Sequence, residues 1–450
     1  MSIIGLSRAL AERAITSRHL VEQALAAIRD QAGEGARAFI AVHETEALAA
    51  AGRTDSQRRG GAKLPTLAGI PVSIKDNFDE AGHVTLAGSM VLAGSAKAAR
   101  DAIVVERLRN AGAILIGRTN MTEFAYSGLG INPHYGTPRN AFDRVTGRLP
   151  GGSSSGAAIS VTDGMAMGAI GTDTGGSIRI PAALNGLVGF KPTARRVPLA
   201  GVLPLSCSLD SAGPLAQTVA ECALLDQVLA GESHGAPEEE IQLRSLRLAV
   251  PKTTFHDDLS AEVAAAFSAA LSRLAAAGAR ITELPMAQLA QAAEVNPRGV
   301  LVSAEAYSWH RHLIASSGTR YDPRVLPRIR AGEATLAADY IELLQRRARF
   351  IREIEAAAAG YDAMLMPTVA DTAPSIAEVT KDDESYFRFN GRMLRNPALV
   401  NLFDGCALSI PCHEPGRAPV GLMVAGTQGT DRRILAIGMA VEQIVRAQPR

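Results

Sequence analysis

The sequence predicts an α/β protein made of one large body with an added subdomain. Its 450 residues are 47% hydrophobic and 20% charged, so the chain can bury a large core and is not disordered as a whole. Short β-branched runs alternate with helical patterns, which is typical of α/β architecture. No long linker divides the chain, and this favours one body over several separate domains.

The amino-terminal half is predicted to contain an opening helix and a βαβ unit. In chain order these elements are the helix 18–29 capped by Ser17, the strand 69–76, the helix 101–111 and the strand 113–117. A proline introduces the first strand, which suits a strand start, and Lys75 falls at the carboxyl end of that strand. Open α/β sheets bind ligands in crevices at the carboxyl ends of their strands. Lys75 is therefore expected where a ligand would lie.

The carboxyl-terminal half is predicted to alternate strands and helices around one irregular segment. In chain order the elements are the strand 246–250, the helices 260–277 and 337–358, the strands 363–366, 407–411 and 420–424, and a helix from about residue 431. Residues 231–240 are rich in Gly, Pro and Glu and are interpreted as a surface excursion or subdomain boundary. Residues 368–400 are polar and aromatic, and such a long irregular segment is predicted to form a pocket wall or lid.

Two segments are rich in glycine and serine: Gly-Gly-Ser-Ser-Ser-Gly at 151–156 and Gly-Thr-Asp-Thr-Gly-Gly-Ser-Ile-Arg at 171–179. Glycine runs let backbone N–H groups converge on one point, at a cost in conformational entropy. A helix is predicted to begin after Gly156, and a helix amino terminus favours negative charge. Serines placed in such turns are candidate nucleophiles.

Lys75 is the candidate base. The chain has only six lysines, so 40 of its 46 basic residues are arginines. Lysine can lose its proton and arginine effectively cannot. To act as a base near neutral pH, a lysine needs a pKa of roughly 7–8 instead of about 10.4, a shift of about 4 kcal/mol that burial imposes. A lone lysine at a strand end more often directs its ammonium to solvent. The presence of the two serine segments favours the interpretation of Lys75 as a base instead.

Charge, cysteine usage and motifs exclude several classes of function. A formal net charge of +1 indicates neither a nucleic-acid nor a membrane partner, and a small polar substrate is expected. No apolar run approaches the roughly 18 residues of a spanning helix, and no leader pattern opens the chain, so the cytoplasm is the expected location. The four cysteines form no Cys-x-x-Cys pair, and no His-Glu-x-x-His or phosphate loop is present, so no metal or cofactor is expected.

Seven segments together resemble the amidase signature family of serine hydrolases. They are 69–76, 117–124, the glycine-serine segments 151–156 and 171–179, 189–193, 208–210 and 400–411. The resemblance implies the family's α/β fold, a large mixed β-sheet covered by helices on both faces, in a single domain over 1–450. It places a core with the catalytic residues at 60–215. Residues 231–400 are expected to form a helical excursion or subdomain that shapes the substrate pocket.

The resemblance implies an amide hydrolase that converts a small-molecule carboxamide to a carboxylate and ammonia or an amine through an acyl-enzyme. Matched residue by residue, it makes Ser177 the nucleophile, Ser153 the bridging serine and Lys75 the base. The two serines are 24 residues apart, as the family's pattern requires. No cofactor is implied, and the partner is a small-molecule amide.

The resemblance also implies an oxyanion hole and a set of supporting residues. The oxyanion hole would consist of the main-chain N–H groups of Thr174, Gly175, Gly176 and Ser177. The supporting residues would be Ser154, Asp173 and Arg179, which are expected to brace the loop. For these three, a local hydrogen bond without direct chemistry is an equally open interpretation.

Two other activities stay open. The family includes the glutamine-hydrolysing A subunit of a tRNA-dependent amidotransferase; the near-neutral charge and the divergent segment 388–401 favour a stand-alone enzyme instead. Residues 152–156 also match the Gly-x-Ser-x-Gly nucleophile elbow of α/β-hydrolases, which would make Ser154 the nucleophile of an esterase-type enzyme. Replacement of Lys75 separates the elbow from the amidase interpretation, because an elbow enzyme would survive it.

The substrate itself is left open. Side chains of the segment 368–400 could grip a carboxylate or line an aryl pocket; they are Arg388, Arg392 and Arg395 for the carboxylate and Tyr386, Phe387 and Phe389 for the pocket. The arginines could equally face solvent. Carboxylated and aryl amides are both candidates, and a homodimer is the base-rate expectation for the oligomeric state.

Overall fold

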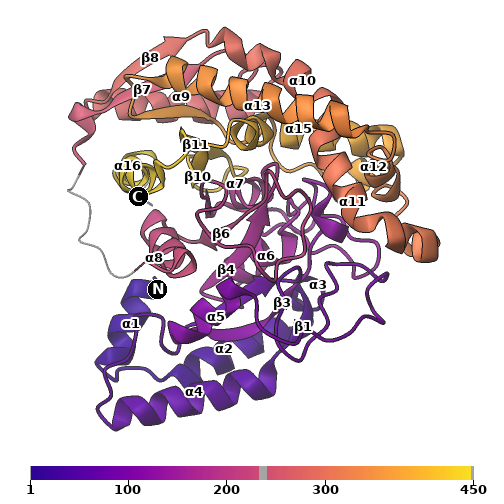
Figure 1. The fold of residues 1–450 in the computed structure, drawn as a ribbon. Helices are drawn as coiled ribbons and strands as arrows, with labels where there is room; N and C mark the ends of the chain where they lie inside the picture. Colours follow the sequence, from indigo (N-terminus) through magenta and orange to yellow (C-terminus); the bar gives the residue numbers. More distant parts are fainter. Residues whose placement is uncertain (1, 233–240, 447–450) are drawn as a thin grey trace.

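The computed structural model describes residues 2–232 and 241–446. Eleven strands of the described chain form one sheet in the order β1-β3-β2-β4-β6-β5-β10-β11-β9-β7-β8 (Figure 1). The strands are β1 (Phe39–Val42), β2 (Pro71–Lys75), β3 (Ile114–Thr119), β4 (Gly168–Asp173), β5 (Val188–Lys191), β6 (Ser211–Ala216), β7 (Arg247–Pro251), β8 (Arg280–Leu284), β9 (Ala363–Pro367), β10 (Cys406–Pro411) and β11 (Gly421–Gly426).

The helices of the described chain surround this sheet. They are α1 (Ile3–Ala11), α2 (Ser17–Arg29), α3 (Gly35–Ala38), α4 (Glu44–Arg59), α5 (Ile103–Asn110), α6 (Ser155–Thr162), α7 (Arg179–Asn185), α8 (Val219–Ala230), α9 (Ala261–Ala276), α10 (Ala292–Val295), α11 (Val300–Ser317), α12 (Leu326–Arg330), α13 (Ala337–Ala358), α14 (Ile376–Thr380), α15 (Asp383–Leu402) and α16 (Asp431–Val445). The sheet is mixed: β2 pairs in parallel with β3 and β4, whereas β10 pairs antiparallel with β5 and β11.

Helices cover both faces of the sheet because strand side chains alternate between two cores. Along β10, Leu408 and Ile410 belong to the cluster that also holds buried side chains of α5, α8, α9 and α16. Ala407, on the opposite face, belongs to the cluster that holds buried side chains of α13 and α15. Period-two alternation between two apolar faces is what a sheet buried on both sides requires.

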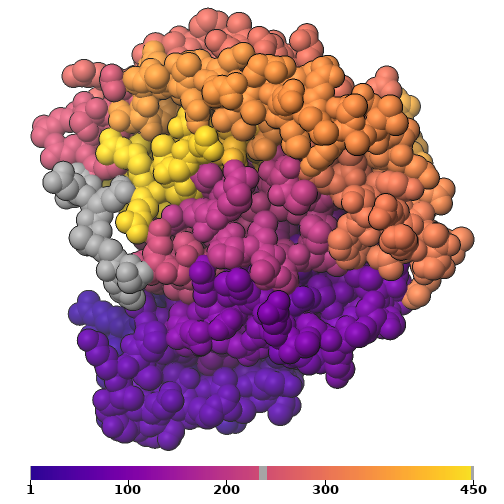
Figure 2. Space-filling view, viewed as in Figure 1, coloured from indigo at the N-terminus to yellow at the C-terminus, as the bar shows by residue number. Residues whose placement is uncertain are grey.

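The chain is laid out along the sheet from one end of the molecule to the other. In Figure 1, α1, α2 and α4 lie at one end, and α9 and α13 lie at the opposite end. Figure 2 shows the same order as bands of colour, with the amino-terminal segment in indigo at the bottom and the orange segments at the top. Between them lies the part of the chain that carries the two glycine-serine segments. Segment 231–400 contributes strands β7, β8 and β9 to the common sheet as well as helices.

Most predicted elements are confirmed. The βαβ unit is β2, α5 and β3, with the two strands parallel, and every carboxyl-terminal strand and helix predicted above is present. The opening helix is also present, but its cap is wrong: the Thr16 hydroxyl accepts the His19 N–H, whereas Ser17 is the first helical residue. The interpretation of residues 231–240 falls mainly on 233–240, outside the described residues.

The prediction that residues 368–400 form an irregular segment is wrong. Residues 383–402 form α15, which begins after Asp382 caps the Ser385 N–H and runs through Pro397. A proline normally argues against predicting a helix around it. In addition, the polar and glycine-containing sequence hides the spacing of the residues that become buried. Tertiary packing overrides both features, because Tyr386, Phe389 and Met393 are buried along one side.

Candidate active site

Lys75 is enclosed in the sheet and contacts two hydroxyl groups. Its Nζ donates to Ser153 Oγ at 2.7 Å and to Thr172 Oγ1 at 2.8 Å. The position follows from the register: β2 and β4 are neighbouring parallel strands, and Lys75 and Thr172 both lie near their carboxyl ends. Lys75 is fully buried, although its ammonium is the kind of group that normally stays in water.

Burial changes the protonation of this lysine. It lowers the pKa of Lys75 to about 7, against the opposing effect of the carboxylates of Asp173 and Asp210. Removing an ammonium from water disfavours the charged form, and no carboxylate of residues 2–232 and 241–446 forms an ion pair with Nζ that would compensate fully. This pKa lies in the range of roughly 7–8 that a lysine base needs near neutral pH.

The first glycine-serine segment places Ser153 beside the lysine. The peptide bond between Gly152 and Ser153 is cis. A side chain at Gly152 would collide with the backbone, since its Cβ would lie 2.4 Å from the Gly130 nitrogen. The segment then enters α6, as predicted, and the Ser154 N–H donates to the Ser177 carbonyl at 3.3 Å. The two glycine-serine segments are therefore held directly against each other.

The second segment is a loop between β4 and α7 that Asp173 organises. The Asp173 carboxylate accepts the N–H of Gly176 at 2.7 Å and that of Ile178 at 3.1 Å, and it pairs with the buried Arg179 guanidinium. Gly176 has φ +124°, and a Cβ there would lie 2.6 Å from Pro397. Only glycine meets both demands. Arg179 holds the pKa of Asp173 well below its usual range even though burial alone would raise it.

Three backbone N–H groups of this loop have no hydrogen-bond acceptor within the described residues. Those of Thr174, Gly175 and Ser177 donate to no acceptor within the described residues, whereas that of Gly176 is engaged by Asp173. All three residues line the same cavity. The loop therefore presents hydrogen-bond donors and a serine side chain to one cavity.

This cavity has a volume of about 450 Å³. Ser177, only 3% exposed, lies on its wall, which also includes the apolar side chains of Leu209, Val302 and Leu399. The α15 residues Leu394 and Arg395 form another part of the wall, so part of segment 368–400 does line the pocket as predicted. A cavity of this size suits a small molecule.

Replacement of Arg179 by methionine is expected to destabilise the protein. The Asp173–Arg179 pair is entirely buried, so the variant would leave a buried carboxylate without its cation. Breaking such a pair lowers the free energy of unfolding by about 3–5 kcal/mol, and thermal unfolding monitored by circular dichroism measures the effect. Asp258→Asn is the matched control: it breaks the ion pair between Arg392 and the 72%-exposed Asp258, which is expected to matter by at most about 1 kcal/mol. Equal melting temperatures for the two variants would contradict the stabilising role of the Asp173–Arg179 pair.

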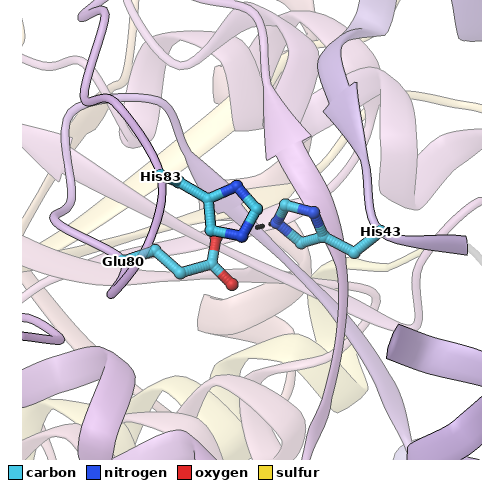
Figure 3. A group of neighbouring side chains, drawn as sticks. All are labelled: His43, Glu80 and His83. Atoms are coloured by element: carbon cyan, nitrogen blue, oxygen red, sulfur yellow. Dashed lines mark hydrogen bonds and ion pairs between the residues drawn. The ribbon is translucent and has the colours of Figure 1, made fainter. Parts of the chain in front are cut away.

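Among the described residues one group has the side chains of a metal site: His43, Glu80 and His83 (Figure 3). Two imidazoles and a carboxylate are ligands typical of zinc. In the structure both oxygens of Glu80 are already engaged, one by His43 Nε2 at 2.7 Å and the other by Arg109 Nη2 at 2.7 Å. Arg118 lies 3.6 Å away as a second cation. The group is an ion-pair network beside β1, and none of its members lines the cavity at Ser177.

The structure brings the sequence-predicted site residues into one region. Lys75 contacts Ser153, and the two serine segments contact each other. Ser154 is buried, with its hydroxyl directed at the Thr172 carbonyl at 3.4 Å. Asp173 and Arg179 make the loop hydrogen bonds expected of braces.

Sequence reasoning assigned no role to three polar residues that complete this region. Thr172 is the second acceptor of Lys75, Asp210 accepts the Thr174 hydroxyl, and Asn401 donates to Asp173 at 3.0 Å. Thr172 could have been found from its place as the second residue of the second glycine-serine segment, directly after the apolar run that ends at Ile170. Asp210 and Asn401 lie in segments that carry the family resemblance, but only the tertiary structure shows what they contact.

Comparisons with known proteins agree on one family. The family model for amidases matches residues 19–435. A 2-amino-5-chloromuconic acid deaminase of Comamonas testosteroni is 37% identical over 89% of this chain and 86% of its own. The A subunit of the glutamyl-tRNA(Gln) amidotransferase of Symbiobacterium thermophilum is 34% identical over 99% of this chain and 97% of its own. A crystal structure of an amidase superposes with a TM-score of 0.89 at 34% identity, covering 99% of this chain and 100% of that one.

The chain therefore belongs to the amidase signature family, and its fold is that family's mixed sheet covered by helices. It is a hydrolase that acts on carbon–nitrogen bonds in linear amides. No helix in residues 2–232 and 241–446 is long and apolar enough to cross a membrane.

Proposed function

We propose that the chain hydrolyses small-molecule amides through an acyl-enzyme on Ser177. Neutral Lys75 takes the proton of Ser153 Oγ, Ser153 Oγ takes that of Ser177 Oγ, and Ser177 Oγ attacks the amide carbon. The 2.7 Å contact between Lys75 and Ser153 supports the first transfer. The backbone hydrogen bond from the Ser154 N–H to the Ser177 carbonyl supports the second transfer, because it holds the two glycine-serine segments together.

The negative oxygen of the tetrahedral intermediate would be received by the free N–H groups of the loop. These are the N–H groups of Thr174, Gly175 and Ser177, and each such donor contributes about 3–4 kcal/mol in the transition state. The predicted fourth donor, Gly176, already serves Asp173 at 2.7 Å. We assign Gly176 to the geometry of the loop.

The rest of the cycle returns the protons. Protonated Lys75 gives its proton back through Ser153 to the leaving nitrogen as the carbon–nitrogen bond breaks, and ammonia or an amine departs. Water then attacks the ester on Ser177 and loses a proton to the same relay, and the carboxylate leaves with Ser177 restored. No cofactor takes part in this proposal.

One observation carries the proposal: a fully buried lysine with a pKa of about 7 donates to Ser153 next to a cavity that holds Ser177. The experiment is ammonia release by the purified chain alone, across glutamine, aliphatic amides, aryl amides and carboxylated ureas, with Ser177→Ala as the blank. Turnover that disappears in the blank is the expected result. Turnover that persists in the blank would refute the acyl-enzyme on Ser177.

Activity is expected to rise with pH around neutrality. Below pH 7 Lys75 is protonated and cannot accept a proton, so kcat/KM should fall about tenfold per pH unit there, with a midpoint near 7. The carboxylate of Asp210 raises the pKa of Lys75, so Asp210→Asn should move this midpoint to lower pH. Measured pH profiles of both proteins test this, and a midpoint that moves upward in the variant would contradict it.

A second function is supported by the comparisons. Amidotransferase A subunits match nearly the whole chain, so the same site could release ammonia from glutamine for a partner protein to use. The assay above separates the two functions, because a chain of that kind would be silent by itself and active only with its partner. The elbow alternative has less support, because Ser154 does not line the cavity.

A further inference from the structure

The described residues that line the cavity at Ser177 carry positive charges without negative ones. Among the 22 described residues that line it, three are arginines, Arg298, Arg328 and Arg395, and none is an aspartate or glutamate. The remaining wall is mostly apolar or uncharged. Guanidinium groups that share one cavity wall repel one another, and an anion bound between them would offset that repulsion.

Arg395 is the most informative of the three. It projects from α15, and its Nη2 is buried without a hydrogen-bond acceptor. Its Nε donates to Asn396 Oδ1 at 3.1 Å, so only one edge of the guanidinium is engaged within the described chain. Burial lowers the pKa of Arg395, although Asp257 and Asp258 oppose this from nearby. A buried guanidinium N–H without a protein acceptor has a hydrogen bond left to make, and in a cavity wall a water, an ion or a substrate group can accept it.

The other two arginines add positive charge to the same space. Arg328 is held by Tyr126: Nη1 donates to the Tyr126 carbonyl, and the guanidinium lies 4.3 Å from the centre of the Tyr126 ring. Neither contact neutralises it. Arg298 is exposed at the cavity and, within the described residues, makes no ion pair.

The neighbouring arginines of α15 differ from Arg395. Arg392 is paired with Asp258 and Asp371, and Arg388 is exposed with its guanidinium 4.2 Å from the centre of the Phe389 ring. Neither lines the cavity. Of the three arginines that the sequence offered for a carboxylate, the structure places only Arg395 in the pocket.

We propose that the substrate is an acidic amide, with a carboxylate that binds Arg395 while its carboxamide lies at Ser177. This rests on the proposed function and specifies its substrate class. The planar guanidinium donates two parallel hydrogen bonds to a carboxylate, which fixes the orientation of the substrate as well as its charge. The apolar residues of the cavity lining suit a short hydrocarbon spacer. Monoamides of small dicarboxylic acids have this chemistry.

The test compares matched pairs of amides. Each pair holds a monoamide of a dicarboxylic acid and the neutral amide of equal chain length, for example adipamic acid and hexanamide. With the wild-type chain, kcat/KM is expected to favour the acidic member by about 10–100-fold, the usual effect of a charge-assisted hydrogen-bond pair. Arg395→Gln should remove that preference, so that kcat/KM becomes equal for the two members of a pair. Arg395→Lys should keep part of it.

Arg388→Gln is the matched control, because it removes the same charge from an exposed position of the same helix. Its preference for acidic amides should equal that of the wild type. Calorimetric binding of adipate to each variant gives a readout that does not depend on turnover, and it should weaken about 10–100-fold only in Arg395→Gln.

The outcomes separate this inference from the proposed function. Equal kcat/KM for acidic and neutral amides, or equal losses in Arg395→Gln and Arg388→Gln, would overturn the acidic-substrate assignment while the role of Ser177 stands. Wild-type silence on every acidic amide with no adipate binding would overturn it too. Hydrolysis that persists in Ser177→Ala would instead refute the nucleophile, whatever the charge preference.

Discussion

Replacement of Ser177 by alanine is expected to lower kcat for amide hydrolysis by about 10⁵–10⁶-fold. The variant loses the oxygen that forms the acyl-enzyme, and in serine hydrolases the loss of the nucleophile alone removes nearly all the contribution of the catalytic set. The cavity, the loop and its N–H groups should persist, because the Ser177 hydroxyl makes no hydrogen bond within the described residues. Initial rates of ammonia release measure the effect.

Ser154→Ala is the control for that experiment. Ser154 is the nucleophile only in the elbow interpretation; in the structure its hydroxyl lies 3.4 Å from the Thr172 carbonyl and is buried. Loss of this long hydrogen bond is expected to reduce activity by no more than about tenfold. An inactive Ser154→Ala beside an active Ser177→Ala would reverse the assignment of the nucleophile.

Replacement of Lys75 by methionine is expected to lower kcat by about 10³–10⁴-fold. The variant keeps the length and apolar character of the stem but removes the base that takes the proton of Ser153. Lys75→Arg should be equally inactive, because a guanidinium stays protonated at any pH that the protein survives. A pH profile of any residual activity should lose its midpoint near 7.

Lys191 offers a matched control for Lys75. It is the other fully buried lysine of the described chain, its pKa is lowered to about 8 mainly by burial, and its Nζ donates to the carbonyls of Pro192 and Gly405. Lys191→Met removes a buried ammonium without touching Ser153, so its effect should appear in thermal stability and leave the midpoint near 7 in place. A normal midpoint in Lys75→Met would contradict the role of Lys75.

The fold class and the region of the site could be predicted because their determinants are local. A proline followed by alternating β-branched residues favours β2, and glycine runs favour the turns before α6 and α7. Lys75 could be singled out because lysine is rare here and arginine cannot lose a proton. Each of these arguments uses residues that are close together in the sequence.

The remainder depends on contacts between distant segments. The helix α15 could not be predicted because its polar residues and Pro397 disguise the buried side formed by Tyr386, Phe389 and Met393. The engagement of the Gly176 N–H by Asp173 is a matter of loop geometry that composition does not show. Only the assembled cavity distinguishes Arg395 from Arg388 and Arg392, since all three look alike in sequence.

The most direct test of the acyl-enzyme is to quench the protein with acid during turnover of an activated aryl ester and locate the acyl group by mass spectrometry. Such esters make acyl-enzymes accumulate, with a burst of the aryl alcohol. Trypsin should release residues 149–179 as one peptide that contains both serine segments, so fragmentation of that peptide decides between them. We expect the added mass on Ser177 and none in Ser177→Ala. An acyl group on Ser154, or a burst that survives in Ser177→Ala, would contradict the proposed mechanism.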